Sequence, residues 1–330
     1  MRCTDKRDLR RFVAAGLGLV TAVLLPAIAA AQDYPSRPIR LIVPFAPGGP
    51  ADLLARAVAP SMGTSLKQTV VIENRAGAGG ATGVAAVTTA EPDGYTIGIT
   101  GPGAVVAAPY MTKVPYDHTK DFIPITRVAQ MHGIVVVAAS SPYKTLAELI
   151  AAARANPGKL SFASAGSGTL THLAGELLNI EANVKIVHVP YRGAAPAVAD
   201  LLGGHVQFML PDMSGALGGI RGGTIRALAV TSGKRSPFLP DVPTTAEAGF
   251  PQVLSDSWYG LIAPAGTPPA IVKALYEAAA GALKGNDVAA QIDKQGGVAA
   301  PTTPEEFKAL IIEEQQRWKR VVETTGAKME

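Results

Sequence analysis

The sequence predicts an α/β fold in which sheets of mainly parallel strands are covered by helices on both faces. Short apolar runs recur along the chain, and several are followed by a glycine-rich turn and then by a stretch with helical periodicity. Strands that alternate with helices form parallel sheets, because each helix crosses a face of the sheet to reach the next strand. Ligands of such folds bind beyond the carboxyl ends of the strands, where the turns gather.

The segment from Ile39 to Met62 shows this arrangement most clearly. An apolar run, Ile39–Val43, leads into a turn that contains Gly48 and Gly49, and an amphipathic helix pattern follows. Glycine lets a ligand approach the backbone closely, and the first turn of a helix has unpaired N–H groups at the positive end of its dipole. We therefore predict a seat for a carboxylate or phosphate here. A tight βα turn without a ligand is the alternative for any one such turn.

The same order of strand and turn is repeated along the chain. Apolar strands are predicted at 70–72, 95–100, 159–163, 184–189, 206–210 and 225–231, and glycine-bearing turns follow at 77–80, 101–103, 164–169 and 190–193. Several glycine-rich turns at strand ends are far less expected by chance than one, which favours a site made by several loops.

The C-terminal segment is predicted to be a long helix that belongs to the core. Thr303, Pro304 and Glu306 match a capping box with proline at the first helical position. Apolar residues at helical spacing follow, and Gly326 is expected to end the helix.

The N-terminal segment has the order of a secretory signal, with basic residues before an apolar run that ends in three alanines at Ala31. Cleavage after Ala31 would leave 299 of the 330 residues, and we expect the mature protein in the periplasm. An uncleaved anchor is the alternative, because the run is nearly long enough to span a bilayer. Pro26 and the alanines favour cleavage. Arg10 and Arg11 leave Sec and twin-arginine export both open, although much of the twin-arginine pattern is missing.

Composition excludes several classes of protein. The single cysteine, Cys3, lies in the predicted signal, so the mature chain must rely on its core rather than on disulfides. The signal holds five basic and two acidic residues, so its removal lowers the net charge from +4 to +1. The sequence has no basic stripe with interleaved aromatic residues, so it does not predict nucleic-acid binding. No later apolar run reaches membrane-spanning length, so the mature chain is expected to be soluble.

No pattern predicts catalysis, a cofactor or a metal site. The glycines that open at Gly77 lack the dinucleotide spacing, and no phosphate-loop lysine motif is present. Position 176 is Glu, which excludes a two-histidine zinc helix that starts at His172. Ser167 lies between glycines without the full nucleophile-elbow pattern. A hydrolase or lyase that uses Ser167, with His172 as its base, is retained as a remote alternative.

Two histidines have predicted places. His188 lies in an apolar strand and is expected to belong to the core. His172 falls in the first turn of a helix beside Ser167, where it can contact a ligand or cap its own loop.

Taken together, these motifs resemble the extracytoplasmic receptors of tripartite tricarboxylate transporters, also called the Bug family. The likeness covers essentially the whole mature chain in the same order. It rests on residues 44–50 with Asp52 and Arg56, and on 73–75, 77–80, 92–96, 156–159, 166–168, 172–173, 189–193 and 263–268. Ala76 stands where the family commonly has proline, which should alter the stiffness of the loop rather than its chemistry.

The resemblance implies a type II periplasmic-binding-protein fold, with two α/β lobes and a ligand cleft between them. After a signal peptide at 1–31, residues 32–134 and 255–330 would form the first lobe, and residues 135–254 the second. The chain would cross between the lobes near Ile134–Ala138 and near Trp258–Ala263.

The resemblance also implies a receptor rather than an enzyme, without cofactor or metal. It would capture a small carboxylate, such as a di- or tricarboxylate, an aromatic acid or an amino acid, and deliver it to integral-membrane permease subunits. A receptor that reports to a signalling partner stays open, and analogy favours a monomer. The implied ligand-binding residues are Phe45, Ala46, Gly48 and Gly49 in the first lobe, and Ser164, Gly166, Ser167, Gly168, Thr169, His172, Tyr191, Arg192, Gly193 and Ala194 in the second.

Three further residues are candidates for specificity. The negative charge of Asp52 would oppose an anion, so we expect it to hold the turn at Gly48 and Gly49 rather than the ligand. His132 would offer a donor to a ligand, and Asp212 would pair with an amine or a hydroxyl group. The alternative is that His132 and Asp212 are rim residues.

Overall fold

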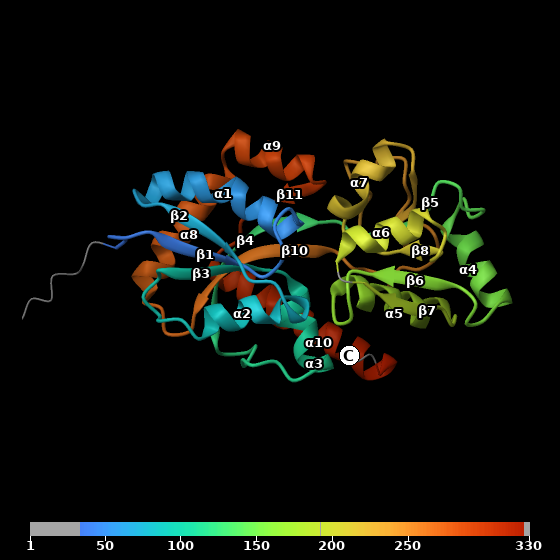
Figure 1. Cartoon of the computed structure of the whole chain (residues 1–330), viewed down its shortest axis with the longest axis horizontal. Coiled ribbons are helices and arrows are strands. Elements are labelled where there is room, and N and C mark those ends of the chain that lie inside the picture. The colour runs from blue at the N-terminus through green and yellow to red at the C-terminus, as the bar shows by residue number, and fades with distance from the viewer. Residues whose placement is uncertain (1–33, 192, 327–330) are drawn as a thin grey trace, which may run out of the picture. The chain divides into compact units, whose positions relative to one another are not determined.

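The computed structural model describes residues 34–191 and 193–326 (Figure 1). The predicted signal peptide, residues 1–31, lies outside the described residues. From Pro35 onward the chain forms one compact unit. None of the helices in the described ranges is both long and apolar enough to cross a membrane.

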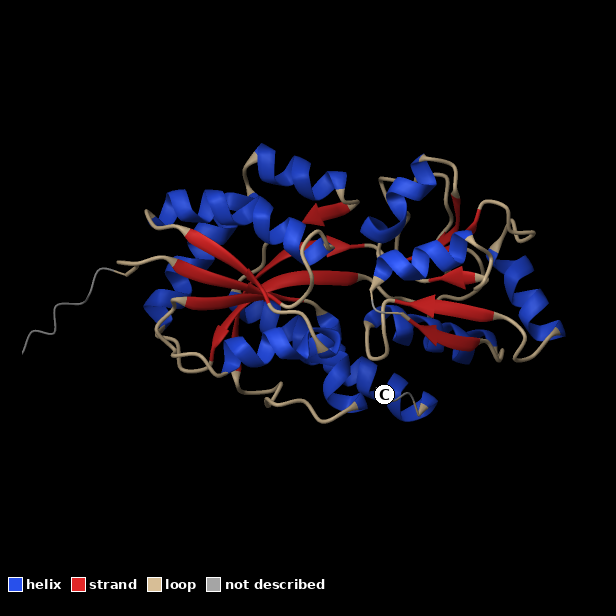
Figure 2. Cartoon of the chain, viewed as in Figure 1, coloured by secondary structure: helices blue, strands red, loops and turns tan. Residues whose placement is uncertain are grey.

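A six-stranded sheet forms the centre of the first lobe, in the order β11-β4-β10-β3-β1-β2 (Figure 2). Its strands are β1 (Ile39–Val43), β2 (Val70–Asn74), β3 (Thr96–Thr100), β4 (Phe122–Met131), β10 (Ser257–Pro264) and β11 (Gly297–Ala299). β1 runs parallel to β2 and β3, whereas β10 runs antiparallel to β3 and β4. Every residue of β3 is buried, as expected for a strand in the middle of a covered sheet.

Helices cover both faces of this sheet. In Figure 1, α1 (Pro50–Leu66), α8 (Pro269–Leu283) and α9 (Asn286–Lys294) lie on one side. The short helix η1 (Ala78–Gly80), α2 (Ala81–Thr88), the π-helical turn η2 (Gly103–Ala107), α3 (Ala108–Met111) and α10 (Pro304–Thr325) belong to the other side. The capping box predicted for α10 is confirmed, and Gly326 ends that helix in a left-handed conformation.

The second lobe is built on a five-stranded sheet in the order β7-β6-β8-β5-β9. Its strands are β5 (Ile134–Ala138), β6 (Ser161–Ser164), β7 (Val187–Pro190), β8 (Phe208–Met209) and β9 (Ile225–Val230). Helices α4 (Leu146–Ala155) and α5 (Leu170–Ala182) contribute to the apolar cluster on one face, and α6 (Ala194–Leu202) and α7 (Met213–Arg221) to the cluster on the other.

Both sheets are mixed, which differs from the parallel sheets that the alternation of strands and helices predicts. β5 runs antiparallel to β8 and β9, and β10 runs antiparallel to its neighbours. These are the strands that receive the chain as it passes between the lobes. A chain that enters a sheet directly, without a crossover helix, is free to run against the strands that βαβ units supply.

The chain passes from the first sheet to the second at His132 and Gly133. It returns near residues 255–256, after a segment that packs on the second-lobe core. Thr231, directly after β9, links the two crossings, because its N–H donates to Gly133 O at 2.8 Å and its carbonyl accepts from Ser255 N at 3.0 Å. The crossings therefore lie slightly before the places expected, since those residues form β5 and most of β10. The limits of the lobes themselves stay a prediction.

One apolar cluster joins helices of both lobes. Leu173 and Leu177 of α5 belong to the same cluster as Val105 of η2 and Phe307 and Trp318 of α10. Because α5 begins directly after the turn at 164–169, packing against the first lobe helps to set the position of that turn.

Candidate functional site

Glycine-bearing turns from the two lobes meet at the carboxyl ends of β2, β3 and β6. A Cβ atom placed on Gly103, after β3, would lie 3.8 Å from the Cα atom of Thr169, and 3.9 Å from each of the carbonyl oxygens of Gly168 and Gly79. In Figure 2 the arrowheads of β6 and β7 point toward the first sheet. The sequence predicts both first-lobe turns, 77–80 and 101–103, but it did not place them among the site residues.

Asp52 holds the turn between β1 and α1. Asp52 is 1% exposed. Its carboxylate accepts hydrogen bonds from Gly48 N at 2.9 Å, Asn74 Nδ2 at 2.9 Å and Arg56 Nε at 2.8 Å. Burial raises the pKa of the Asp52 carboxyl, but the bonds from Arg56, Gly48 and Asn74 outweigh burial and leave that pKa below its ordinary value. Asp52 therefore has the supporting role that the sequence favours for it. The Gly48 N–H is already bonded to Asp52.

Asn74 is a supporting residue to which the sequence assigns no role. Its side-chain amide donates to Phe45 O at 3.0 Å as well as to Asp52, so it ties the end of β2 to the turn after β1. The Phe45 ring lies beside Gly80, where an added Cβ would be 3.2 Å from its Cζ atom. Ala46 and Gly48 are exposed on this turn.

Helix α1 begins without a side-chain cap. Gly49 is its N-cap residue, and Pro50 follows at the first helical position. Because Pro50 has no N–H, the donors of the first turn that lack an intrahelical partner are those of Ala51 and Asp52. These N–H groups are the donors that an anion at this end of the helix would meet.

The turn between β6 and α5 satisfies most of its own N–H groups. Those of Ala165, Gly166, Gly168 and Thr169 donate to Thr171 Oγ1, Ser164 Oγ, His172 Nδ1 and Gly166 O, at 3.0, 3.1, 3.3 and 3.3 Å respectively. The Ser167 N–H has no hydrogen-bond partner among the described residues. Ser164 is fully buried, and its hydroxyl group supports the turn through its bond with Gly166 N.

Two neutral histidines stack beneath this turn. The rings of His172 and His188 have centroids 3.8 Å apart and an interplanar angle of 10°. His188 Nε2 lies 2.6 Å from Ser164 Oγ. Burial lowers the pKa of His172 to about 4, and burial together with the neighbouring His172 lowers the pKa of His188 to about 3.

His172 caps its own turn, which is one of the two roles left open by the sequence. Its neutral Nδ1 atom accepts the Gly168 N–H, and its Nε2 atom lies 3.9 Å from Glu176 Oε1. No hydrogen bond joins His172 to Ser167 among the described residues, so the pair lacks the contact that a hydrolytic base would need. Contact between His172 and a ligand stays a prediction. His188 is a half-buried strand residue that also stacks on Phe162.

The turn after β7 supports the turn after β6. Tyr191 N donates to Ser164 O and Gly193 N donates to Ala165 O, both at 3.1 Å. Gly193 is the N-cap of α6 and provides no side-chain cap, so the first N–H groups of that helix, from Ala194 onward, have no capping partner. The prediction for Arg192 falls outside the described residues.

The hydroxyl group of Tyr191 is hydrogen-bonded to a residue of α6. It donates to Asp200 Oδ2 at 2.6 Å. Burial and this bond to Asp200 raise the pKa of Tyr191 to about 12.

Asp212 is hydrogen-bonded to residues of both lobes. It caps α7, where its Oδ1 atom accepts from Ser214 Oγ at 2.5 Å and from Gly215 N at 3.3 Å. Its Oδ2 atom accepts from Tyr259 Oη of the first lobe at 3.2 Å, and burial together with Asp212 raises the pKa of Tyr259 well above its ordinary value. Nothing in the sequence places Tyr259 beside Asp212. Pairing of Asp212 with a ligand stays a prediction.

His132 lies on the first crossing segment and faces the second. Its Nδ1 atom is 3.4 Å from Asp256 Oδ2, and that oxygen accepts a hydrogen bond from Gln130 Nε2 at 2.9 Å. The Nδ1 atom is buried and has no hydrogen-bond partner among the described residues. A donor role toward a ligand stays a prediction for His132.

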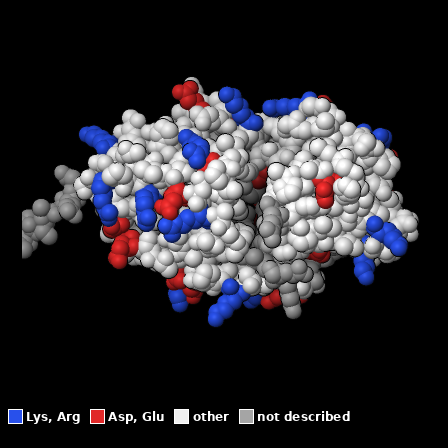
Figure 3. Space-filling view, in the orientation of Figure 1, with Lys and Arg blue, Asp and Glu red and all other residues white. Residues whose placement is uncertain are grey.

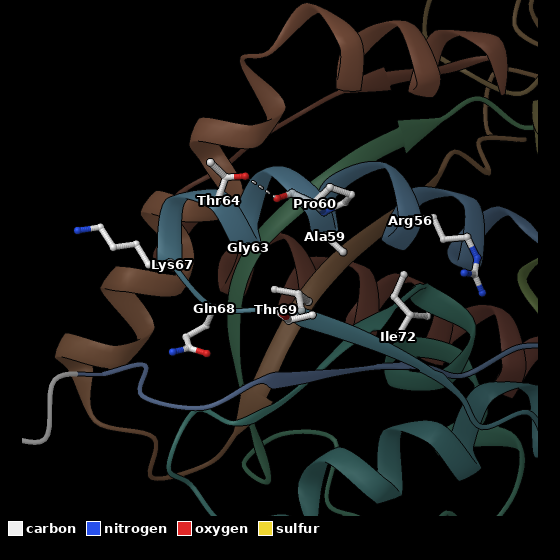
Figure 4. Close-up of a pocket in the computed structure, with 10 residues that line it drawn as sticks. Arg56, Ala59, Pro60, Gly63, Thr64, Lys67, Gln68, Thr69 and Ile72 are labelled. Carbon is white, nitrogen blue, oxygen red and sulfur yellow. Dashed lines mark hydrogen bonds between the residues drawn. The ribbon is translucent and has the colours of Figure 1, made fainter.

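Hollows of different kinds lie on the surface of the described residues. Figure 3 shows a furrow between the two lobes on the face in view, and no large patch of one sign of charge. A separate groove of about 860 Å³ lies along α1 and the edge strand β2, with Arg56, Lys67 and Ile72 in its lining (Figure 4). None of the predicted ligand-binding residues lines that groove. Among the described residues, no cluster of three or more metal-ligating side chains is present.

Comparison with known proteins places the chain in one family. Residues 54–327 match the model of the tripartite tricarboxylate transporter family receptor. The chain is 38% identical to protein BugT of Bordetella pertussis over 322 residues, which cover 97% of this chain and 98% of BugT.

Solved structures share the fold over nearly the whole chain. The periplasmic binding protein BugD is 35% identical, with a TM-score of 0.82 over 90% of this chain and all of BugD. A Rhodopseudomonas palustris protein with adipate is 33% identical, with a TM-score of 0.84 over 90% of this chain and all of that one. MatC of Rhodopseudomonas palustris with bound malate is 34% identical, with a TM-score of 0.81 over 88% of this chain and all of MatC.

These likenesses confirm the two-lobed periplasmic-binding-protein fold and the family resemblance that the sequence motifs indicate. The family consists of binding proteins, described as receptors of tripartite tricarboxylate transporters. By the length of the match and the degree of identity, this chain belongs to the tripartite tricarboxylate transporter receptor family.

Proposed function

We propose that this protein is a periplasmic receptor that binds a small dicarboxylate where the turns of its two lobes meet, and delivers it to the permease subunits of a tripartite carrier. The observation that carries the proposal is the approach of Gly103 of the first lobe, which lies beside Gly79, to Gly168 and Thr169 of the second. Relatives that are 33% and 34% identical bind, or are seen with, adipate and malate, which supports a dicarboxylate.

Two helix ends supply the donors for such a ligand. Helix α1 of the first lobe and helix α6 of the second both begin at a glycine without a side-chain cap. Each end offers N–H groups and a positive dipole to one carboxylate, and the Ser167 N–H adds a donor from the turn at 164–169. A dicarboxylate that reaches both ends would hold the lobes together. Each charge-assisted bond contributes about 1.5–3 kcal/mol, and about 8 kcal/mol in total gives micromolar affinity.

The other ligand-binding residues named from the resemblance remain part of this proposal. Phe45 and Ala46 would form the first-lobe wall, and Tyr191 would lie on the second-lobe side. Ligand contact by Arg192 is kept as it follows from the resemblance. The proposal also includes lobes at 32–134 with 255–330 and at 135–254, cleavage after Ala31, and a monomer. Mass spectrometry of protein secreted to the periplasm would test the cleavage point, and light scattering the monomer.

A binding screen tests the receptor role. The secreted protein would be titrated calorimetrically with malate, adipate, citrate, benzoate and glutamate, with the uncharged diamide of adipate as the control. At a hundred times its dissociation constant, a bound acid should raise the free energy of unfolding by about 2.7 kcal/mol, and the diamide should not. If no acid binds, and mass spectrometry of the denatured protein shows no retained ligand, the proposed function is wrong.

Gly49 allows the α1 seat to be tested without harm to the fold. Its φ of −78° suits any residue, and an added Cβ would meet only Ala46 O, at 3.6 Å. Gly49→Asp should leave stability unchanged or raise it, because aspartate is a preferred N-cap. The same change should weaken dicarboxylate binding at least about tenfold, because it places a charge in the seat and occupies its N–H groups.

Two control variants separate the causes at Gly49. Gly49→Ala adds only volume and should bind within about threefold of wild type, and Gly49→Asn, which fills the N–H groups without charge, should fall between. Equal affinity of Gly49→Asp and Gly49→Ala would exclude the α1 end as a ligand seat.

A further inference from the structure

The helix after β3 starts with an irregular turn at the meeting point of the lobes. Residues Gly103–Ala107 form a π-helical turn, in which Ala108 N donates to Gly103 O. In a regular α-helix the Ala108 N–H would go to Ala104 O instead. A π turn of this kind changes the direction of the backbone and leaves carbonyl groups without their usual partners.

Pro109 lies just after this turn and cannot donate a backbone hydrogen bond to it. Pro109 is the residue whose N–H would bond to Val105 O in an α-helix and to Ala104 O in a π-helix, and proline has no N–H. Pro109 therefore leaves Ala104 O without its π-helical donor and Val105 O without its α-helical one. Both residues are buried, where an unpaired carbonyl is costly.

Two side chains from other parts of the chain supply these donors. Tyr116 Oη donates to Ala104 O at 2.7 Å. Gln315 of α10, 210 residues further along the chain, donates through its Nε2 atom to Val105 O at 3.1 Å, and also to His118 O at 3.2 Å. Gln315 is 7% exposed, and its amide has the two N–H groups that two carbonyl acceptors require.

The turn held in this way contacts the second lobe. Gly103 approaches Gly168 and Thr169, and Val105 packs in the cluster that contains Leu173 and Leu177 of α5. The π-helical turn is thus part of the first-lobe surface, together with α10, against which the turn at 164–169 and the start of α5 pack.

We propose that Gln315 is a positioning residue for ligand binding, which holds the π-helical turn so that Gly103 meets the second-lobe turn. This inference rests on the proposed receptor function. Gln315 touches no ligand itself, because its amide is buried against Val105 and His118 on the core side of the turn. It acts through the backbone that it orients.

Gln315→Glu tests this role through a pH profile. An ionised glutamate of the same shape has only acceptor atoms, which would face the carbonyl oxygens of Val105 and His118, whereas a protonated one can donate to one of them. Burial raises the pKa of a carboxyl, so the variant should be ionised near pH 9 and protonated near pH 6. Its affinity for the dicarboxylate should be at least about tenfold below wild type near pH 9, and within about threefold of it near pH 6.

The neighbouring Gln316 provides a matched control. Gln316 is exposed on the same helix, so Gln316→Glu adds the same charge one residue away and should bind like wild type at both pH values. A loss of affinity in Gln315→Glu that is equal at both pH values, or no loss at all, would overturn the proposal.

Other titrating groups around the amide are the same in each protein. They include Glu314 and Arg317, which pair on α10, and Tyr116 and His118, whose groups lie at the same carbonyls as the amide. Tyr110 of α3 contacts the His118 ring. The wild-type profile, measured over the same range, therefore accounts for them, and the comparison reports only the introduced carboxyl.

Hydrogen exchange gives a second readout that needs no ligand. Amides of residues 103–111 should exchange faster in Gln315→Glu than in wild type near pH 9, and at wild-type rates in Gln316→Glu. If wild type binds no acid, the receptor function fails while exchange still decides the positioning role. Should Gln315→Glu not fold, Gln315→Leu, which removes both donors without charge, should bind more weakly than wild type at every pH, and unchanged affinity would contradict the proposal.

Discussion

Replacement of Gly133 by alanine is expected to lower the free energy of unfolding by about 3 kcal/mol. Gly133 lies on the first crossing segment, and an added Cβ would collide with Thr231 Oγ1 and come within 2.6 Å of Ser255 O and 2.9 Å of Ser255 Oγ. Ser255 O belongs to the backbone, so no rotation of a side chain relieves the overlap.

The cost at Gly133 has two parts. Overpacking of a filled site costs about 1–3 kcal/mol. The Thr231 and Ser255 hydroxyls, bonded to each other at 3.0 Å, would also be forced apart, which removes about 1 kcal/mol. Because both crossing segments must shift, the relative placement of the lobes and the ligand affinity should change as well.

Urea unfolding followed by circular dichroism would measure the effect. Gly218 in α7 is the matched control, because an added Cβ there meets nothing within 4 Å. Gly218→Ala should be neutral or stabilising by about 0.5–1 kcal/mol, since alanine favours a helix over glycine. If Gly133→Ala lay within about 0.5 kcal/mol of wild type, the tight contact between the crossing segments would be refuted.

Acidification is expected to remove about 3 kcal/mol of stability through His172. The pKa of His172 is about 4 in the folded protein, because burial disfavours the charged ring, against an ordinary value of 6.5. The unfolded chain therefore takes up the proton first as pH falls. The contribution of the neutral ring is fully present above pH 6.5 and is lost progressively as pH falls to about 4.

His188 acts in the same direction. Its pKa of about 3 extends the loss to lower pH, and the two stacked rings titrate as a pair, so their losses are not summed. Protonation of His172 also removes the acceptor for the Gly168 N–H, so the turn at 164–169 should loosen. Ligand affinity should therefore decline together with stability.

The free energy of unfolding as a function of pH, in wild type and in His172→Gln, would test this linkage. Glutamine offers an acceptor for the Gly168 N–H but does not titrate, so the variant should show a flatter profile between pH 6.5 and about pH 4. Parallel profiles for the two proteins would show that His172 is not the source of the acid sensitivity.

Local features of this protein follow from its sequence because they depend on residues a few positions apart. The capping box at Thr303 joins residues three apart. The bond from Gly48 N to Asp52 spans four residues, and Gly48 has a φ of +84°, which favours glycine. Strand and helix periodicities are likewise set within a few residues, so the glycine-bearing turns and their places at strand ends are readable from the chain.

Only the tertiary structure decided which of these turns meet and which donors remain open. The carbonyl of Val105 finds Gln315 from 210 residues away, and Tyr259 reaches Asp212 across the lobes, because packing rather than spacing brings these groups together. The turn at 164–169 looks like an anion seat in the sequence, yet it directs most of its N–H groups to its own Ser164, Thr171 and His172. Which partner a backbone N–H takes depends on the side chains that the fold places within 3 Å or so of it, and spacing along the chain does not record that.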